Sequence, residues 1–191
     1  MLEKPNFYSV IIGTELLNGR RKDAHFAFIN QQLLSRGWEQ KASFVINDDT
    51  NLMENIFNLI KNDPNSVMFC FGGIGATPDD YTRVVAGKVF RDGKMEFHEE
   101  AKNKIINQFG DEAYPHRINM AYLPINAKLL KNVVNNVAGF YLEDRFFFTP
   151  GFPSMSQAMV IEALDKIYPK SNIEKYRKVM TINASENDLI D

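Results

Sequence analysis

The sequence lacks features that several classes of protein need. It contains a single cysteine, Cys70, so it cannot form an internal disulfide or build a metal site from thiolates alone. No apolar run approaches the ~20 residues of a membrane-spanning helix. The N-terminus also lacks the basic and then apolar stretch of a secretory signal. These absences predict a soluble, cytoplasmic protein with no membrane partner.

The sequence also lacks an excess of charge of either sign. Its 22 Lys and Arg residues nearly balance 24 Asp and Glu residues, for a formal net charge of −2. Without a basic run of five or more residues, the chain has no electrostatic footprint of a dedicated nucleic-acid binder. There is no internal repeat, and 45% of the 191 residues are hydrophobic, which suffices for roughly one packed domain.

Three strand-and-helix units follow one another in the first half of the chain. Short aromatic and β-branched runs predict strands, and apolar residues at helical spacing predict the helices between them. The expected strands are 7–12, 42–46 and 66–71, and the expected helices are 23–36 and a segment through 52–60 capped by Asp49 or Thr50. Serial units of this kind indicate an α/β fold with a parallel sheet.

The second half of the chain gives a less regular pattern. Helices are expected over 81–90 and 99–109, whereas 113–131 shows no clear period. A strand pair over 141–142 and 145–149, turning at Glu143–Asp144, precedes a helix over 154–168. We therefore expect one domain over 1–168. Residues 169–191, with a possible strand at 179–182, form a polar tail or the start of a small C-terminal unit.

The strongest local signal is the glycine-rich segment 71–82, FGGIGATPDDYT. Glycines directly after a buried strand let the backbone approach a ligand, and the start of the next helix favours an anion. The segment has no Gly-Lys-Ser/Thr of a Walker A loop, and Pro78 replaces the last glycine of a dinucleotide fingerprint. We predict that it binds a phosphate or carboxylate. The candidate ligand-binding residues here are Gly72, Gly73, Gly75 and Thr77.

Two interpretations of the aspartates in this segment remain open. In the first, Thr77 caps a helix, Pro78 occupies its first turn, and Asp80 is the reciprocal cap. In the second, Asp79 and Asp80 share a divalent cation such as Mg²⁺ with ligand phosphates. Two carboxylates and a phosphate repel one another unless a cation lies between them.

Other turns are expected at the same edge of the sheet, because the carboxyl ends of parallel strands line one crevice. Each turn alone is typical of ordinary structure, but together they predict a shared site. The residues concerned are Gly13, Thr14, Glu15, Asp48, Gly151 and Pro153, with Ser154 as the expected cap of the last helix.

A short basic run precedes the first long helix. Arg20, Arg21 and Lys22 are followed closely by His25. This segment could capture a phosphate or carboxylate through Arg20 and His25, or it could be a solvated loop. Both interpretations stay open at this point.

Four motifs in order resemble a known family. They are GTELLNG at 13–19, the turn at 48–49, GGIGATPDDYT at 72–82 and PGFP at 150–153. Together they resemble the molybdopterin-binding domain of molybdenum-cofactor biosynthesis, and most closely a short single-domain branch of the CinA-like proteins. The resemblance covers roughly residues 7–168. It implies a three-layer α/β sandwich with a mostly parallel sheet and a small β excursion before the last strand–helix unit.

The resemblance also implies a function. The turns would form one pocket for the phosphate of a molybdopterin or nucleotide, with Asp80 and Asp48 catalytic and Asp80 and Asp79 holding Mg²⁺ or a similar metal. CinA-like domains are associated with metal-dependent hydrolysis of ADP-ribose-type pyrophosphates. The alternatives are adenylyl transfer in molybdenum-cofactor biosynthesis and non-catalytic binding. We further expect a homo-oligomer without a nucleic-acid partner.

Some segments depart from the family pattern. Many CinA-like domains have asparagine where this chain has His25, although a short single-domain branch shares the form of residues 19–25. Residues 135–139, NNVAG, replace the usual Gly-Thr-Ala-Pro-Gly. The nicotinamide-nucleotide deamidase domain of full-length CinA has no counterpart in these 191 residues, so that activity is not transferred.

Overall fold

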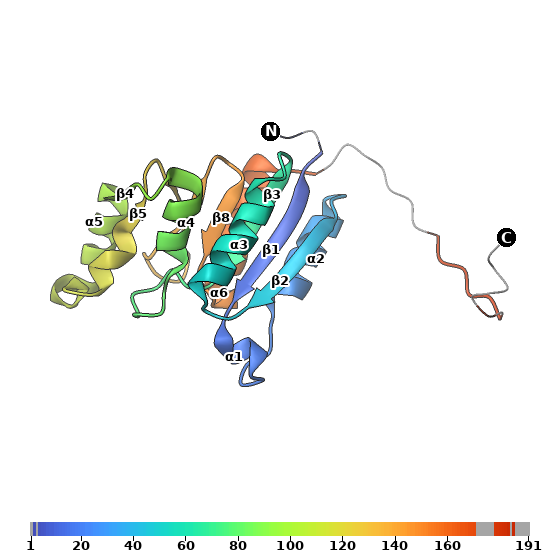
Figure 1. Ribbon diagram of the computed structural model, residues 1–191, viewed down its shortest axis with the longest axis horizontal. Coiled ribbons are helices and arrows are strands. Elements are labelled where there is room, and N and C mark those ends of the chain that lie inside the picture. The colour runs from blue at the N-terminus through green and yellow to red at the C-terminus, as the bar shows by residue number, and fades with distance from the viewer. Residues whose placement is uncertain (1, 3, 171–177, 184, 186–191) are drawn as a thin grey trace.

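A six-stranded sheet forms the centre of the protein in the computed structural model (Figure 1), which describes residues 2, 4–170, 178–183 and 185. The strand order is β2-β1-β3-β8-β7-β6. The first four strands in this order are parallel, and β7 and β6 are each antiparallel to their neighbour. The strands are β1 Asn6–Ile12, β2 Gln40–Ile46, β3 Ser66–Phe71, β6 Lys128–Leu130, β7 Gly139–Leu142 and β8 Phe146–Thr149.

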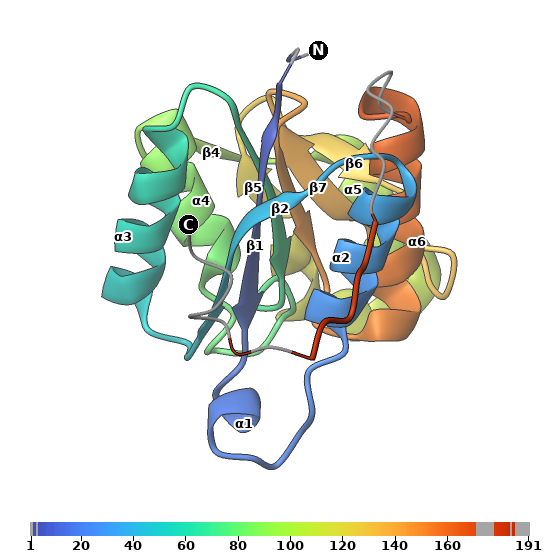
Figure 2. The same ribbon diagram turned by 90° about the vertical axis from the view of Figure 1, so that its right-hand side faces the viewer.

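Helices cover both faces of this sheet. Alternate side chains of β1 point to opposite faces, so Val10 packs in one apolar cluster and Ile11 in another. The first cluster includes residues of α3 (Thr50–Lys61) and α4 (Thr82–Arg91). The second includes residues of α2 (His25–Ser35) and α6 (Pro153–Ile167). Figure 2 shows the two pairs of helices on either side of the sheet, which confirms the predicted three-layer sandwich.

The middle of the sheet is aromatic and fully buried. Every residue of β3 and β8 is buried. Phe69 of β3 stacks on Phe147 of β8 with 4.9 Å between ring centroids. A strand buried on both faces needs no polar alternation, which is why the run 66–71 appears in the sequence as continuous apolar residues.

Several local predictions are confirmed. The carboxylate of Asp49 caps α3 by accepting a hydrogen bond of 2.8 Å from the N–H of Leu52. Strands β7 and β8 form the predicted hairpin, and its turn residues Glu143 and Asp144 have φ of 57° and 55°. The predicted helix 99–109 is α5, Glu99–Phe109.

A small lobe lies beside α4 and contains elements that the sequence pattern missed. Strands β4 (Met95–Phe97) and β5 (Tyr122–Pro124) form a separate antiparallel sheet. Two 3₁₀ helices, Gly110–Ala113 and Arg117–Ala121, connect α5 to β5. Figure 1 shows α5, β4 and β5 together at one end of the molecule. This lobe and the β6–β7 pairing form the β excursion expected before the last strand–helix unit.

Two predicted helix caps are wrong. Helix α4 begins at Thr82 after the residue Tyr81, so Thr77 and Asp80 form a turn before the helix instead of its capping pair. Helix α6 begins at Pro153, and the residue before it, Phe152, supplies no side-chain cap. Ser154 is therefore inside the first turn, because proline, whose missing N–H is harmless there, already occupies the first helical position.

The end of the chain gives one further correction. Residues 179–182 were expected to form a strand, but residues 178–183 have no regular secondary structure. The rest of the predicted tail or C-terminal unit, 171–177, 184 and 186–191, lies outside the described residues. None of the helices in the described part of the chain has the length and apolar composition needed to span a membrane.

Candidate functional site

A cleft of about 450 Å³ lies where the carboxyl ends of β1, β2, β3 and β8 meet. This volume is in the range of small-molecule binding sites. The edge of the sheet therefore brings together most of the residues that the sequence singled out. Those that line the cleft are Gly13, Glu15, Asp48, Gly72, Gly73, Gly75, Thr77, Asp79, Asp80 and Gly151.

Thr14 and Arg20 do not line the cleft. The N–H and hydroxyl of Thr14 donate to Oδ2 of Asp48 at 3.0 and 2.8 Å, so Thr14 holds that carboxylate in place. Arg20 is exposed on the loop that follows the short helix α1, Thr14–Leu17. The neighbouring Arg21 lines the cleft instead, although sequence reasoning had favoured Arg20.

His25 and Pro153 lie behind the turn at Gly151. His25 is 4% exposed, its ring stacks on Phe71, and its Nε2 lies 3.2 Å from the carbonyl oxygen of Gly151. The hydroxyl of Ser156 lies 3.4 Å from Nδ1. Burial is the largest influence on this ring and lowers the pKa of His25. A neutral ring that donates from Nε2 to Gly151 fits these contacts, so His25 supports the turn from behind.

Four carbonyl groups of the glycine-rich loop, those of residues 72–75, are bound by the first two residues of α4. The hydroxyl of Thr82 donates to the carbonyl of Gly72 at 3.0 Å, and the N–H of Thr82 donates to Gly73 at 3.0 Å. Nη1 of Arg83 donates to the carbonyls of Ile74 and Gly75. Four consecutive carbonyls therefore face α4. Sequence reasoning did not assign a role to Arg83.

The N–H groups of the same loop face the other way. In a trans peptide the N–H points opposite to the carbonyl of the preceding residue. The N–H groups of residues 73–76 are thus directed away from α4, and all four residues line the cleft. Within the described part of the chain these N–H groups have no hydrogen-bond partner. Consecutive outward N–H groups form a concave site for an anion.

Close contacts restrict one glycine of the loop and one glycine of the turn that faces it. Gly73 has φ of 68°, and a Cβ added there would lie 2.2 Å from the hydroxyl oxygen of Thr82. A Cβ at Gly151 would lie 3.3 Å from the Cα of Gly72, because the two turns meet backbone to backbone. A side chain at Gly73 would push the loop away from the start of α4, and one at Gly151 would crowd the turn at Gly72.

The carboxylates stand around this loop. Oδ2 of Asp80 accepts hydrogen bonds from the N–H and the hydroxyl of Thr77, at 2.8 and 2.5 Å. Asp79 is exposed beside it. The described residues include no group of three or more His, Cys, Asp or Glu side chains placed to hold a metal. A divalent cation at Asp79 and Asp80 fits only if phosphates and water supply its other ligands, which is how Mg²⁺ usually binds.

The remaining walls differ in character. On one side, the guanidinium of Arg21 lies 5.3 Å from the ring centroid of Phe152 and donates to the carbonyl of Gly151 at 3.1 Å. On the other, Phe109 and Met120 bring apolar surface from the small lobe. Asn135, in the segment that departs from the family pattern, also lines the cleft.

Comparison with known proteins identifies the family. Residues 9–169 match the family described as "Probable molybdopterin binding domain". Protein PF0476 of Pyrococcus furiosus is 31% identical over 181 residues, which cover 87% of this chain and 71% of that protein. A CinA-like protein of Geotalea uraniireducens is 32% identical over 161 residues, 80% of this chain but 37% of that protein. The chain thus spans well under half of that CinA-like relative.

Solved structures agree with this assignment. The protein CinA from Thermoplasma acidophilum, described as having unknown function, superposes with a TM-score of 0.75 at 26% identity. The match covers 84% of this chain and 97% of that one. The molybdopterin biosynthesis Mog protein from Mycobacterium ulcerans superposes with a TM-score of 0.54 at 15% identity over 85% of this chain and 93% of that one, and shares the fold. The chain therefore belongs to the molybdopterin-binding domain family, among its CinA-like members.

Proposed function

We propose that the cleft binds the phosphate group of a pterin or nucleotide. The observation that carries this proposal is the run of four N–H groups, residues 73–76, that face the cleft without a partner in the described part of the chain. Phosphate oxygens accept such hydrogen bonds well, and helix α6 directs its positive N-terminal end toward the same cleft through Phe152 and Met155.

The catalytic function that we propose is metal-dependent hydrolysis of an ADP-ribose-type pyrophosphate. Asp79 and Asp80 would hold Mg²⁺ or a similar cation together with the substrate's own phosphate oxygens. When bound, such a cation supplies neutralisation of phosphate charge and activation of water. The loop N–H groups would stabilise the charge that develops on the phosphate as the bridging P–O bond breaks.

Asp48 is the group that we propose to receive the proton of the attacking water. Thr14 fixes its Oδ2 through two hydrogen bonds, which leaves Oδ1 as the acceptor. Water then forms the new P–O bond, and the bridging oxygen leaves with the second phosphate. A carboxylate held at the cleft by its neighbours is suited to this role because its orientation needs no rearrangement during the reaction.

A second candidate function is binding or adenylylation of molybdopterin without pyrophosphate hydrolysis. Two observations favour it. The family description names a molybdopterin-binding domain, and the described residues supply at most a pair of carboxylates for a metal. A non-catalytic binding domain would use the same loop and would need no metal at all.

Ligand screening tests the proposal and separates the two functions. Thermal unfolding should be followed with ADP-ribose, FAD, AMP, ATP and molybdopterin, each with and without Mg²⁺, since a ligand stabilises by RT ln(1 + [L]/Kd). Turnover of ADP-ribose and of molybdopterin with ATP is then measured with Mg²⁺, Mn²⁺ and Co²⁺. Binding without turnover by any metal would leave only the binding function, and no binding by any of these ligands would refute both. The predicted homo-oligomer stays a prediction.

A further inference from the structure

Arg83 is a buried cation with no carboxylate at ion-pair distance among the described residues. It is the second residue of α4 and is 8% exposed. Its Nη1 donates to the carbonyls of Ile74 and Gly75 beneath the glycine-rich loop. Among the described residues it forms no ion pair. The guanidinium is thus hydrogen-bonded, and the carboxylate of Asp80 acts on its charge from beyond ion-pair distance, which offsets part of the effect of burial on the pKa of Arg83.

Such an arrangement is costly unless something else balances the charge. Removal of a guanidinium from water is unfavourable, and backbone carbonyls compensate only part of that loss. A single layer of peptide groups separates the guanidinium of Arg83 from the cleft. These peptides direct their carbonyl groups at Arg83 and their N–H groups at the cleft. A phosphate bound at the loop would bring negative charge close to Arg83.

We propose that Arg83 is a positioning residue that makes the loop an anion receptor selective for highly charged phosphates. It holds the carbonyls of Ile74 and Gly75 on the α4 side, which turns the N–H groups of Gly75 and Ala76 toward the cleft. Its charge, which Asp80 offsets only in part, adds attraction for the same ligand. This inference rests on the phosphate binding proposed above and extends it by naming the residue that sets the selectivity.

The proposal predicts a graded preference. Inorganic pyrophosphate should bind more tightly than phosphate, and phosphate more tightly than acetate, because charge and the number of acceptor oxygens both fall in this order. A loop that relied on its glycines alone would discriminate less between these anions. The three probes are small enough to report on the loop without contacts from the rest of the cleft.

Arg145 provides a matched control. It too donates from a part-buried guanidinium to backbone carbonyls, those of Ser66 at 2.9 Å and Asp63 at 3.0 Å. It lies at the opposite end of the sheet, where β3 begins and β8 follows the hairpin turn. The substitution Arg145→Met therefore removes the same chemical group from the same kind of contact, away from the cleft.

The experiment is an amide chemical-shift titration of the folded protein with pyrophosphate, phosphate and acetate. In the native protein, the amide resonances of residues 73–76 should shift with pyrophosphate. Arg83→Met should weaken pyrophosphate binding ~10-fold or more and flatten the preference over acetate, on the scale of one lost charge-assisted interaction. Arg83→Lys, which keeps the charge, should recover most of the preference. Arg145→Met should bind like the native protein.

The outcomes separate this inference from the proposed function. The role of Arg83 is overturned if pyrophosphate does not shift the amide resonances of residues 73–76 in the native protein. It is also overturned if Arg83→Met binds pyrophosphate like the native protein, or if Arg145→Met loses as much binding as Arg83→Met. The protein could bind small anions in a way that depends on Arg83 and yet neither bind nor turn over any nucleotide or pterin. That result refutes the proposed function and supports the inference. If Arg83→Met is unfolded, Arg83→Gln, which keeps hydrogen-bond donors but removes the charge, takes its place in the same titration. Weaker pyrophosphate binding by Arg83→Gln supports the inference, and native-like binding overturns it.

Discussion

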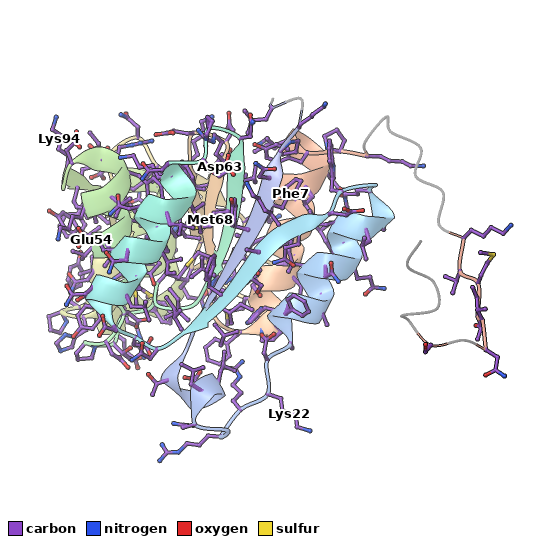
Figure 3. All side chains as sticks on the ribbon, turned by 45° about the vertical axis from the view of Figure 1, so that its right-hand side comes forward. Phe7, Lys22, Glu54, Asp63, Met68 and Lys94 are labelled. Carbon is purple, nitrogen blue, oxygen red and sulfur yellow. The ribbon has the colours of Figure 1, made fainter. Side chains whose placement is uncertain are left out.

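The two ends of the central sheet are built on opposite principles. At the amino ends of β1 and β3, Asp63 accepts hydrogen bonds from Asn6 and Tyr8, each 2.8 Å, and from Lys41 at 2.9 Å. At the carboxyl ends, the glycine-rich loop leaves its N–H groups directed at a cleft. Figure 3 shows Asp63 at one end of the sheet and Lys22, on the loop after α1, at the other.

The two ends differ in how their hydrogen-bonding groups are used. At the amino end, the carboxylate of Asp63 is paired with the side chains around it, which stabilises the fold. At the carboxyl end, Thr82 and Arg83 bind only the carbonyl side of the loop, so its donors stay available. We call the hydrogen-bonded cluster around Asp63 the closed end of the sheet and the cleft at the glycine-rich loop its receptive end, and substitutions at each should have different consequences.

The largest effect is expected from Gly73→Ala at the receptive end. The left-handed φ costs about 1–2 kcal/mol for an L-residue, and the contact with Thr82 adds strain. We expect a loss of about 3 kcal/mol in unfolding free energy and no stabilisation by pyrophosphate. Gly93→Ala, with φ of 77° and no heavy atom within 4 Å of the added Cβ, is the control. In denaturant unfolding, Gly93→Ala should lose only the free energy that the left-handed φ costs. An equal loss in both variants would contradict the role of the contact with Thr82.

Asp80→Asn should act on chemistry with little effect on folding. An amide oxygen can still accept the two hydrogen bonds from Thr77, so the turn should survive and stability should change by at most about 1 kcal/mol. Without the negative charge, a divalent cation is held poorly, and we expect pyrophosphate turnover to fall ~10²-fold with loss of metal dependence. The measurement is ADP-ribose hydrolysis across a metal series. Unchanged turnover would reduce Asp80 to a residue that closes the turn.

The fold could be predicted from the sequence where the local sequence of a segment is enough to determine its secondary structure. The apolar run 66–71 and the helical spacing over 52–60 depend on local pattern, and both predictions are confirmed. Strands β4 and β5 contain three residues each, and their pairing depends on contacts between Phe97 and Tyr122, whose rings are 5.1 Å apart. No periodicity can appear in so short a strand, so this sheet could not be predicted.

The site could be predicted in outline for a different reason. Parallel strands place the turns after them at one edge, and this rule alone brought Gly13, Asp48 and Gly151 together. It could not reveal that Arg83 binds the loop from beneath. The expected helix 81–90 places Arg83 near the start of α4, but which carbonyls its guanidinium reaches depends on the path of residues 72–76, which no pattern in the sequence predicts. Which of two adjacent arginines faces the cleft depends on the path of the loop after α1, which sequence does not fix.

A smaller effect is expected at the closed end from Asp63→Asn. Partial burial alone would raise the pKa of Asp63, but hydrogen bonds from Lys41, Tyr8 and Asn65 lower it well below its usual value of 3.8. The carboxylate therefore stabilises the folded state at neutral pH, and this contribution is lost as the pH falls below about 4. We expect Asp63→Asn to lose about 2 kcal/mol at pH 7.

The pH dependence checks the origin of that loss. Urea unfolding at pH 7 and at pH 3 should show the difference between native and Asp63→Asn proteins narrowing in acid, because Asp63 of the unfolded chain takes up a proton near its usual pKa of 3.8 while the folded protein still holds the carboxylate ionised. Pyrophosphate binding at neutral pH should stay native-like, since the substitution is at the far end of the sheet. A difference that widens in acid, or a loss of binding, would contradict the separation of the two ends.

The smallest effect is expected from His25→Asn, which removes the support behind Gly151. At pH 7.5 it should cost about 1 kcal/mol, the scale of one lost hydrogen bond and some packing. Burial lowers the pKa of His25 from its usual 6.5 in the folded state, so the unfolded chain binds its proton first as the pH falls. The native protein should therefore lose stability below about pH 6.5, and the difference from His25→Asn should shrink by pH 5. Urea unfolding at both pH values measures this, with His116→Asn at an exposed site as the control. If His116→Asn changes the pH dependence of stability as much as His25→Asn does, the effect does not come from the buried position of His25. The pH-sensitive support proposed behind Gly151 would then be refuted.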